Sequence, residues 1–100
     1  AIMCGNDSSA LGALVAANVV GVEDILIYGI DGSPDVKKEL VKEDTFITAT
    51  VGQSTKEIGS KAVEVAIKLM KQEKIEKVTY VPTFMITKEN VDTYGVEEWQ

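Results

Sequence analysis

Residues 24–34 read Asp-Ile-Leu-Ile-Tyr-Gly-Ile-Asp-Gly-Ser-Pro and contain the pattern that decides the fold. The apolar run within 24–29 is continuous rather than alternating, as expected for a parallel strand that is covered on both faces. A polar turn follows at 31–34, in which Ser33 is the predicted N-cap and Pro34 fits the first helical position. This stretch therefore predicts a strand that leads through a short turn directly into a helix.

The same unit recurs on both sides of this stretch. Upstream, residues 1–5 predict a short buried strand and residues 10–20 an apolar helix, which ends at Gly21 because glycine readily adopts a positive φ. Downstream, the second helix runs to about Glu43, and residues 46–51 predict the next strand. Polar and apolar side chains alternate along that strand, which indicates an edge position or one partly exposed face.

The last part of the chain predicts one long helix and a final strand. Ser54 and Glu57 match a capping box, in which the two residues satisfy each other's free backbone amides, and the helix runs to about Gln72. Residues 78–86 predict a strand that a proline interrupts, and residues 87–94 predict a short helix. The order βαβαβαβ with short connections predicts an α/β fold: an open parallel sheet with flanking helices and right-handed crossovers.

The composition excludes several classes of function. The chain has 100 residues, a single-domain length, and 45% of them are hydrophobic, which is ordinary for a globular core. The net charge is −6 and all ten basic residues are lysines, which argues against binding to nucleic acids or to anionic membrane surfaces. No run approaches the roughly 20 apolar residues that are needed to span a bilayer.

Nothing in the sequence predicts catalysis or a metal site. The chain lacks the glycine-rich and nucleophile motifs of nucleotide-binding enzymes and hydrolases, and it contains no histidine. The single cysteine, Cys4, lies inside an apolar strand run, where we expect a small buried hydrophobe rather than a thiolate nucleophile. Without histidine, a transition-metal site is not expected either. We therefore expect no enzyme activity, no metal and no cofactor.

A polar carboxylate or amide side chain follows three of the predicted strands, at Asn6, Asp31 and Gln53. Because ligands of open α/β sheets bind beyond the carboxyl ends of the strands, we expect these side chains to share one rim. A carboxylate and two primary amides, without a basic or nucleophilic partner, are suited to binding neutral hydroxyl groups. The three residues are therefore the candidate ligand-binding residues.

Each candidate also has a purely structural interpretation. Asn6 is equally well explained as a turn residue that satisfies the local backbone. Asp31 fits the first position of an Asp-Gly turn, but the serine that follows already supplies the helix cap, so ligand contact is favoured. Ligand contact is favoured for Gln53 too, because glutamine is not a typical cap or turn residue. For Asp7 we expect a role as N-cap of the first helix, with Ser8 as the alternative.

Three segments stand out as motifs: residues 5–13 (Gly-Asn-Asp-Ser-Ser-Ala-Leu-Gly-Ala), 29–35 (Gly-Ile-Asp-Gly-Ser-Pro-Asp) and 49–54 (Ala-Thr-Val-Gly-Gln-Ser). Together they closely resemble the ribose-type periplasmic sugar-binding proteins of ABC transporters. The ending at 81–92 is also similar to the close of such proteins. The resemblance covers nearly the whole chain in order, but only the carboxy-terminal part of a family member.

In that family, two α/β lobes close on a monosaccharide, and the loaded protein docks on a membrane permease. The resemblance implies that Asn6, Asp31 and Gln53 hydrogen-bond sugar hydroxyls from the second lobe. It also implies that residues 1–53 and 83–94 form part of that lobe, whereas 54–81 pack on the other lobe. The implied location is extracytoplasmic, in the periplasm or lipid-anchored on the outer cell surface. The aromatic rings that sandwich the sugar in the family have no clear counterpart here.

Two other functions remain open on the sequence alone. The effector-binding region of a lactose-repressor-type transcription regulator has the same fold, but such regulators commonly carry Asp-Asp where this chain has Asp31-Gly32. A small nucleotide-binding, Rossmann-like enzyme domain is the other alternative, and the missing glycine fingerprint weighs against it.

The resemblance further predicts that the chain is a fragment of a larger protein or associates with itself. The capped helix carries an apolar stripe at helical spacing, formed by Ile58, Ala62, Val65, Ala66 and Leu69. If the helix belongs to another lobe, this stripe faces solvent here, and each large side chain forgoes very roughly 1.5–3 kcal/mol of burial.

Overall fold

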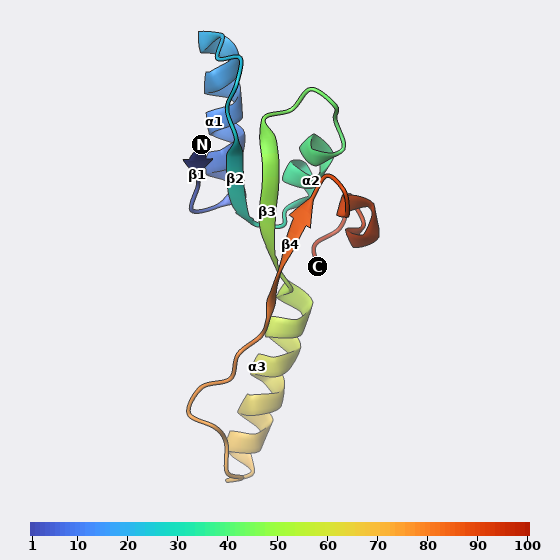
Figure 1. Cartoon of the computed structure of the whole chain (residues 1–100). Helices are drawn as coiled ribbons and strands as arrows, with labels where there is room; N and C mark the ends of the chain where they lie inside the picture. The colour runs from blue at the N-terminus through green and yellow to red at the C-terminus, as the bar shows by residue number, and fades with distance from the viewer.

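The computed structural model describes residues 1–100 as an open four-stranded sheet with helices (Figure 1). Its elements in chain order are β1 (Ile2–Met3), α1 (Asp7–Val20), β2 (Ile27–Asp31), α2 (Pro34–Leu40), β3 (Ile47–Gln53), α3 (Thr55–Met70), β4 (Thr83–Thr87) and the 3₁₀ helix η1 (Val91–Tyr94). The strands lie in the order β1-β2-β3-β4. The predicted α/β class, an open sheet with flanking helices, is confirmed.

The sheet is mixed, because its last strand runs against the others. β1 pairs with β2 and β2 with β3 in parallel, whereas β4 pairs with β3 in the antiparallel direction. The expectation of a fully parallel sheet was therefore wrong for β4. The physical reason is the course of α3: it leaves from the carboxyl end of β3 without crossing the sheet, and the chain returns to that same end (Figure 1). A strand that starts there can only run back along β3.

Several predicted boundaries also differ from the structure. β3 lies between β2 and β4, so the edge position expected for it is wrong, and its alternating burial reflects a partly exposed face instead. Residues 78–82 are not a strand, and within 87–94 only η1 is helical. The ends of β1, α2 and α3 fall two to three residues inside the predicted limits, at Met3, Leu40 and Met70.

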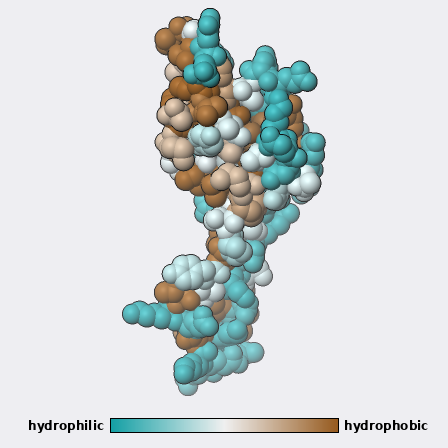
Figure 2. Space-filling model, in the orientation of Figure 1, coloured by the Kyte–Doolittle hydropathy of each residue, from teal (hydrophilic) through white to brown (hydrophobic).

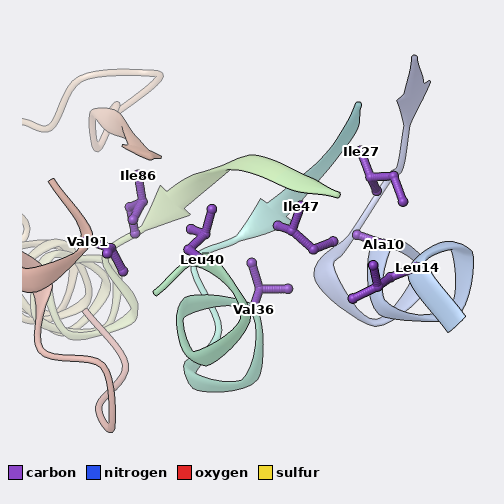
Figure 3. Close-up of a cluster of buried hydrophobic side chains, with 8 residues drawn as sticks. All are labelled: Ala10, Leu14, Ile27, Val36, Leu40, Ile47, Ile86 and Val91. Atoms are coloured by element: carbon purple, nitrogen blue, oxygen red, sulfur yellow. The ribbon is translucent and has the colours of Figure 1, made fainter. Parts of the chain in front are cut away.

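The hydrophobic core lies between one face of the sheet and the helices α1 and α2. Right-handed crossovers that advance in one direction along a sheet place their helices on the same face. The chain advances in one direction here, from β1 through β2 to β3, with α1 and α2 as the two connecting helices. Figure 3 shows the helices on the same side of the strands, with the core side chains between them. The buried side chains of this core are Ala10, Leu14, Ile27, Val36, Leu40, Ile47, Ile86 and Val91.

The opposite face of the sheet has no helix against it. Ile30, Val51 and Met85 form one cross-strand row there, because Ile30 pairs with Val51 and Val51 with Met85. Ile30 is 36% exposed and Met85 52% exposed. A row of apolar side chains in register on an open face is unusual for a finished domain, because burying it would add hydrophobic stabilisation.

α3 projects away from the sheet, and none of its residues is buried (Figure 1). The chain is accordingly elongated, 59 × 23 × 16 Å, with a radius of gyration of 17.0 Å, against about 13 Å for a compact domain of this length. Figure 2 shows hydrophobic residues exposed among hydrophilic ones on the projecting part. No helix of the chain has the length and apolar character needed to cross a membrane.

Lys37 of α2 is fully buried and fixes the end of the chain against the sheet domain. Its Nζ donates to the backbone carbonyls of Tyr94 (3.2 Å), Gly95 (2.8 Å) and Glu98. Burial lowers the pKa of Lys37, and the nearby Glu98 carboxylate acts in the opposite direction. The ammonium group thus satisfies three carbonyls of the tail at once, which a shorter or apolar side chain cannot do.

Lys37→Met is expected to release this tail. Methionine keeps much of the apolar stem but removes the donors, so we expect the free energy of unfolding to fall by about 1–3 kcal/mol in denaturant titrations. The single tryptophan, Trp99, lies in the tail, and its fluorescence should shift to the red. Lys38→Met is the matched control, because Lys38 is exposed and pairs only with Glu97 at 2.8 Å. Equal effects of the two substitutions would contradict the role given to Lys37.

Candidate functional site

The carboxyl ends of β1, β2 and β3 form one rim of the sheet, and the three candidate residues lie along it. Asn6 directly precedes α1, Asp31 ends β2 and Gln53 ends β3. The side chains of the last two are in contact, since Gln53 Nε2 donates to Asp31 Oδ1 at 3.2 Å. Both are half-buried and open to the rim. The structure therefore brings Asp31 and Gln53 together and places Asn6 on the same rim.

Asn6 is the N-cap of α1, and its Oδ1 accepts a hydrogen bond from Ser9 N at 2.8 Å. The expectation that Asp7 or Ser8 caps this helix was wrong, because α1 already begins at Asp7. The structural interpretation of Asn6 thus accounts for its amide oxygen. Its amide nitrogen has no partner in the chain, and it remains available as a donor at the rim.

Asp31 has a backbone conformation that is rare for its residue type. Its φ is 129°, in the region that favours glycine. A side chain held in such a conformation costs of order 1–3 kcal/mol, which the surrounding structure must offset. Strain of this kind concentrates at functional sites, and here it falls on the only carboxylate among the three candidates.

Asp7 lies beneath the rim with both carboxylate oxygens in use, and only 2% of it is exposed. Its Oδ2 accepts from Ser33 N at 2.6 Å, and its Oδ1 accepts from the hydroxyl of Thr50 at 2.6 Å. This contact was not predicted from the sequence. A signal was present in Gly29, an isolated glycine in an apolar strand, because such glycines mark a close approach: a Cβ at Gly29 would lie 2.3 Å from Asp7 Oδ1.

The chemistry of the rim is that of hydrogen bonding to neutral groups. One carboxylate and two amides supply acceptors and donors, and no lysine forms a hydrogen bond or ion pair with any of the three. No cluster of three or more His, Cys, Asp or Glu side chains is arranged to hold a metal ion. Cys4 is a free, half-buried thiol in the segment between β1 and Asn6.

Comparison with curated proteins gives a consistent set of relatives, although no family model matches the chain. The ribose import binding protein of Salmonella typhimurium is 42% identical over 76 residues, which is 76% of this chain and 25% of that protein. The ribose import binding protein of Escherichia coli is 41% identical over the same length, with the same coverage. The chain belongs to the family of ribose-type periplasmic sugar-binding proteins. It spans about a quarter of the length of these curated relatives, which are solute-binding transport proteins rather than enzymes.

Solved structures agree with this family. A solute-binding protein of an ABC transporter from Agrobacterium vitis, with bound allitol, has a TM-score of 0.86 at 29% identity and covers 93% of this chain and 32% of its own. A periplasmic solute-binding protein from Actinobacillus succinogenes, with bound D-allose, has a TM-score of 0.83 at 29% identity and the same coverage. The elongated arrangement of sheet and α3 is thus found within larger sugar-binding proteins.

The strain at Asp31 predicts that its glycine variant is more stable than its alanine variant, the reverse of the usual order. Asp31→Gly relieves the positive φ, whereas Asp31→Ala keeps a Cβ in it, so the glycine variant should be more stable by about 1 kcal/mol. The opposite order is expected at Asp35 in the first turn of α2. There the alanine variant should be more stable than the glycine variant by about 0.5–1 kcal/mol. Urea denaturation of the four variants measures both differences. Alanine more stable than glycine at both positions would contradict the strain.

Proposed function

We propose that this chain forms part of the substrate-binding component of an ABC sugar importer, and that Asn6, Asp31 and Gln53 bind hydroxyls of a monosaccharide, ribose or a related sugar. The observation that carries the proposal is the contact between Asp31 and Gln53 at the rim. Asn6 lies at the same rim after β1, with an amide nitrogen that has no partner in the chain. The relatives support it, because those from Salmonella typhimurium and Escherichia coli are named for ribose import and another from Escherichia coli is named for D-allose binding.

The side chains suit this ligand class chemically. A sugar hydroxyl donates one hydrogen bond and accepts others, so it pairs best with a carboxylate on one side and an amide N–H on the other. Asp31 offers the carboxylate, and the amides of Asn6 and Gln53 offer the donors. A phosphate or carboxylate ligand would instead call for a cationic side chain at the rim.

We further propose that the chain contributes to two lobes. Residues 1–53 and 83–94 form part of the second lobe, and residues 54–81 pack on the other lobe. The exposed stripe of α3 supports this division: Ile58 is 43% exposed and Leu69 is 56% exposed. The residues of the stripe line an apolar groove. Ile75 and Val81, in the segment that returns from α3 to β4, line the same groove and so extend the stripe.

The proposed partner is the permease of the importer, and the proposed location is extracytoplasmic, in the periplasm or on the outer cell surface through a lipid anchor. A relative from Escherichia coli that is 32% identical over 87 residues is named a D-allose-binding periplasmic protein, which supports such a location.

Sugar binding is testable in a joined protein, in which this chain replaces the matched quarter of the Escherichia coli ribose import binding protein. Calorimetric titration with pentoses and hexoses should show binding of one or more of these sugars. Asp31→Asn should weaken that binding about 10- to 100-fold, because a charge-assisted acceptor of sugar hydroxyls is lost. Asp24→Asn, the same change before the amino end of β2 and so at the opposite end of the sheet from the rim, should leave the affinity unchanged. A joined protein that folds but binds no sugar would contradict the proposed function.

The proposed division into lobes predicts the behaviour of the 100-residue chain by itself. Because the stripe of α3 lacks a covering surface, the chain should associate with itself in analytical ultracentrifugation, and Leu69→Lys should weaken that association at least tenfold, consistent with the loss of a buried leucine. Ser60→Lys adds the same charge on the opposite side of α3 and is the control. A well-folded monomer would contradict the exposed stripe.

A further inference from the structure

We propose that Asp7 and Thr50 are positioning residues for Asp31. Neither lies at the open rim, since Asp7 is 2% exposed and Thr50 is 0% exposed. Both instead hold the turn that follows Asp31 and thereby set the direction of its carboxylate. This inference rests on the proposed function, because it takes Asp31 as the residue that binds a sugar hydroxyl.

A hydrogen-bonded network fixes two consecutive amides of that turn. Asp7 Oδ2 accepts from Ser33 N at 2.6 Å, and the hydroxyl of Thr50 donates to Asp7 Oδ1 at 2.6 Å. The same hydroxyl oxygen accepts from Gly32 N at 3.2 Å. The amides directly after Asp31 are therefore both tied to one buried carboxylate–hydroxyl pair.

Asp31 is consequently held from both directions along the backbone. Before the turn, it is part of β2 and pairs with Gly52 of β3. After it, Gly32 and Ser33 are held by the network. The strained φ of 129° at Asp31 persists between these two restraints. Because the direction of a side chain follows from its backbone angles, the network determines where the carboxylate points.

A carboxylate at position 7 does what an amide cannot do. No salt bridge in the chain involves Asp7, so its burial is offset by hydrogen bonds and by the two helix N-termini that meet there, at the first residue of α1 and the N-cap of α2. Its two oxygens accept from both donors at once. An asparagine has one acceptor oxygen and would leave one donor without its present partner.

The test compares isosteric substitutions in the joined protein described above. Thr50→Val removes the hydroxyl at nearly constant volume and should weaken sugar affinity about 10-fold, because Gly32 N and one oxygen of Asp7 lose their partner. Thr50→Ser restores the hydroxyl and should retain the affinity. Asp7→Asn should act like Thr50→Val. An affinity for the Thr50→Val variant equal to that of the unsubstituted protein would overturn the proposal.

A double-substitution cycle separates positioning from a merely structural effect. If Thr50 acts through Asp31, then Thr50→Val should cause no further loss of affinity in an Asp31→Ala background. Equal losses in both backgrounds would mean that Thr50 supports the lobe in general, and would overturn the proposal. Ile27→Val is the control for stability: Ile27 is fully buried at the far end of β2, so its truncation should lower stability and leave affinity unchanged.

Failure of the proposed function has a different signature from failure of the positioning role. In the first case, the folded joined protein binds no sugar at all. The positioning role is then still testable by the HN–Hα coupling constant of Asp31 in nuclear magnetic resonance spectra of the same protein. Thr50→Val should change that coupling and Thr50→Ser should preserve it. An unchanged coupling in Thr50→Val would contradict the role of the network.

Discussion

The parallel pairing of β1, β2 and β3 is the constraint on which the rest of the structure depends. It places the carboxyl ends of three strands at one rim, and with them the first turns of α1, α2 and α3. The N-caps Asn6, Ser33 and Ser54 lie along this rim, so free backbone donors and polar side chains gather there. The buried carboxylate of Asp7 ties two of these turns together. Fold and candidate site are thus consequences of the same arrangement of strands.

Much of this arrangement could be predicted from the sequence, because it follows from local patterns. The continuous apolar run before Asp31 and the turn Gly32-Ser33-Pro34 predicted β2 and the start of α2, and Ser33 is the observed cap. Ser54 likewise caps α3, accepting from Glu57 N at 3.1 Å. The shared rim of Asn6, Asp31 and Gln53 followed from the rule that ligands bind beyond the carboxyl ends of strands.

Apart from element boundaries and the cap of α1, the failures concern contacts between distant segments. The direction of β4 depends on whether α3 packs on this sheet, which a pattern within the chain does not determine. Asp7 resembled a helix cap because it follows a strand and precedes an apolar helix. Its actual partners, Ser33 and Thr50, lie 26 and 43 residues away. No local pattern in α2 distinguishes Lys37 from the exposed lysines of the chain, yet it is fully buried and holds the tail. Local patterns predict elements well, but a buried polar group is defined by the segments that converge on it.

The shape of the chain gives the proposed site its physical context. The body presents one wall of a binding site at the rim, and α3 leaves from the same rim, immediately after Gln53 (Figure 1). A second wall would therefore be carried by whatever covers the apolar stripe of α3. Sugar affinity would then depend on bringing the two walls together, because hydroxyls held on one side only remain in contact with water on the other.

The most direct test of the central claim is a crystal structure of the joined protein with its bound sugar. We expect the carboxylate of Asp31 and the amides of Asn6 and Gln53 within hydrogen-bond distance of sugar hydroxyls. A sugar bound elsewhere, with these three side chains facing only water, would contradict the claim that the rim of β1, β2 and β3 is the binding site.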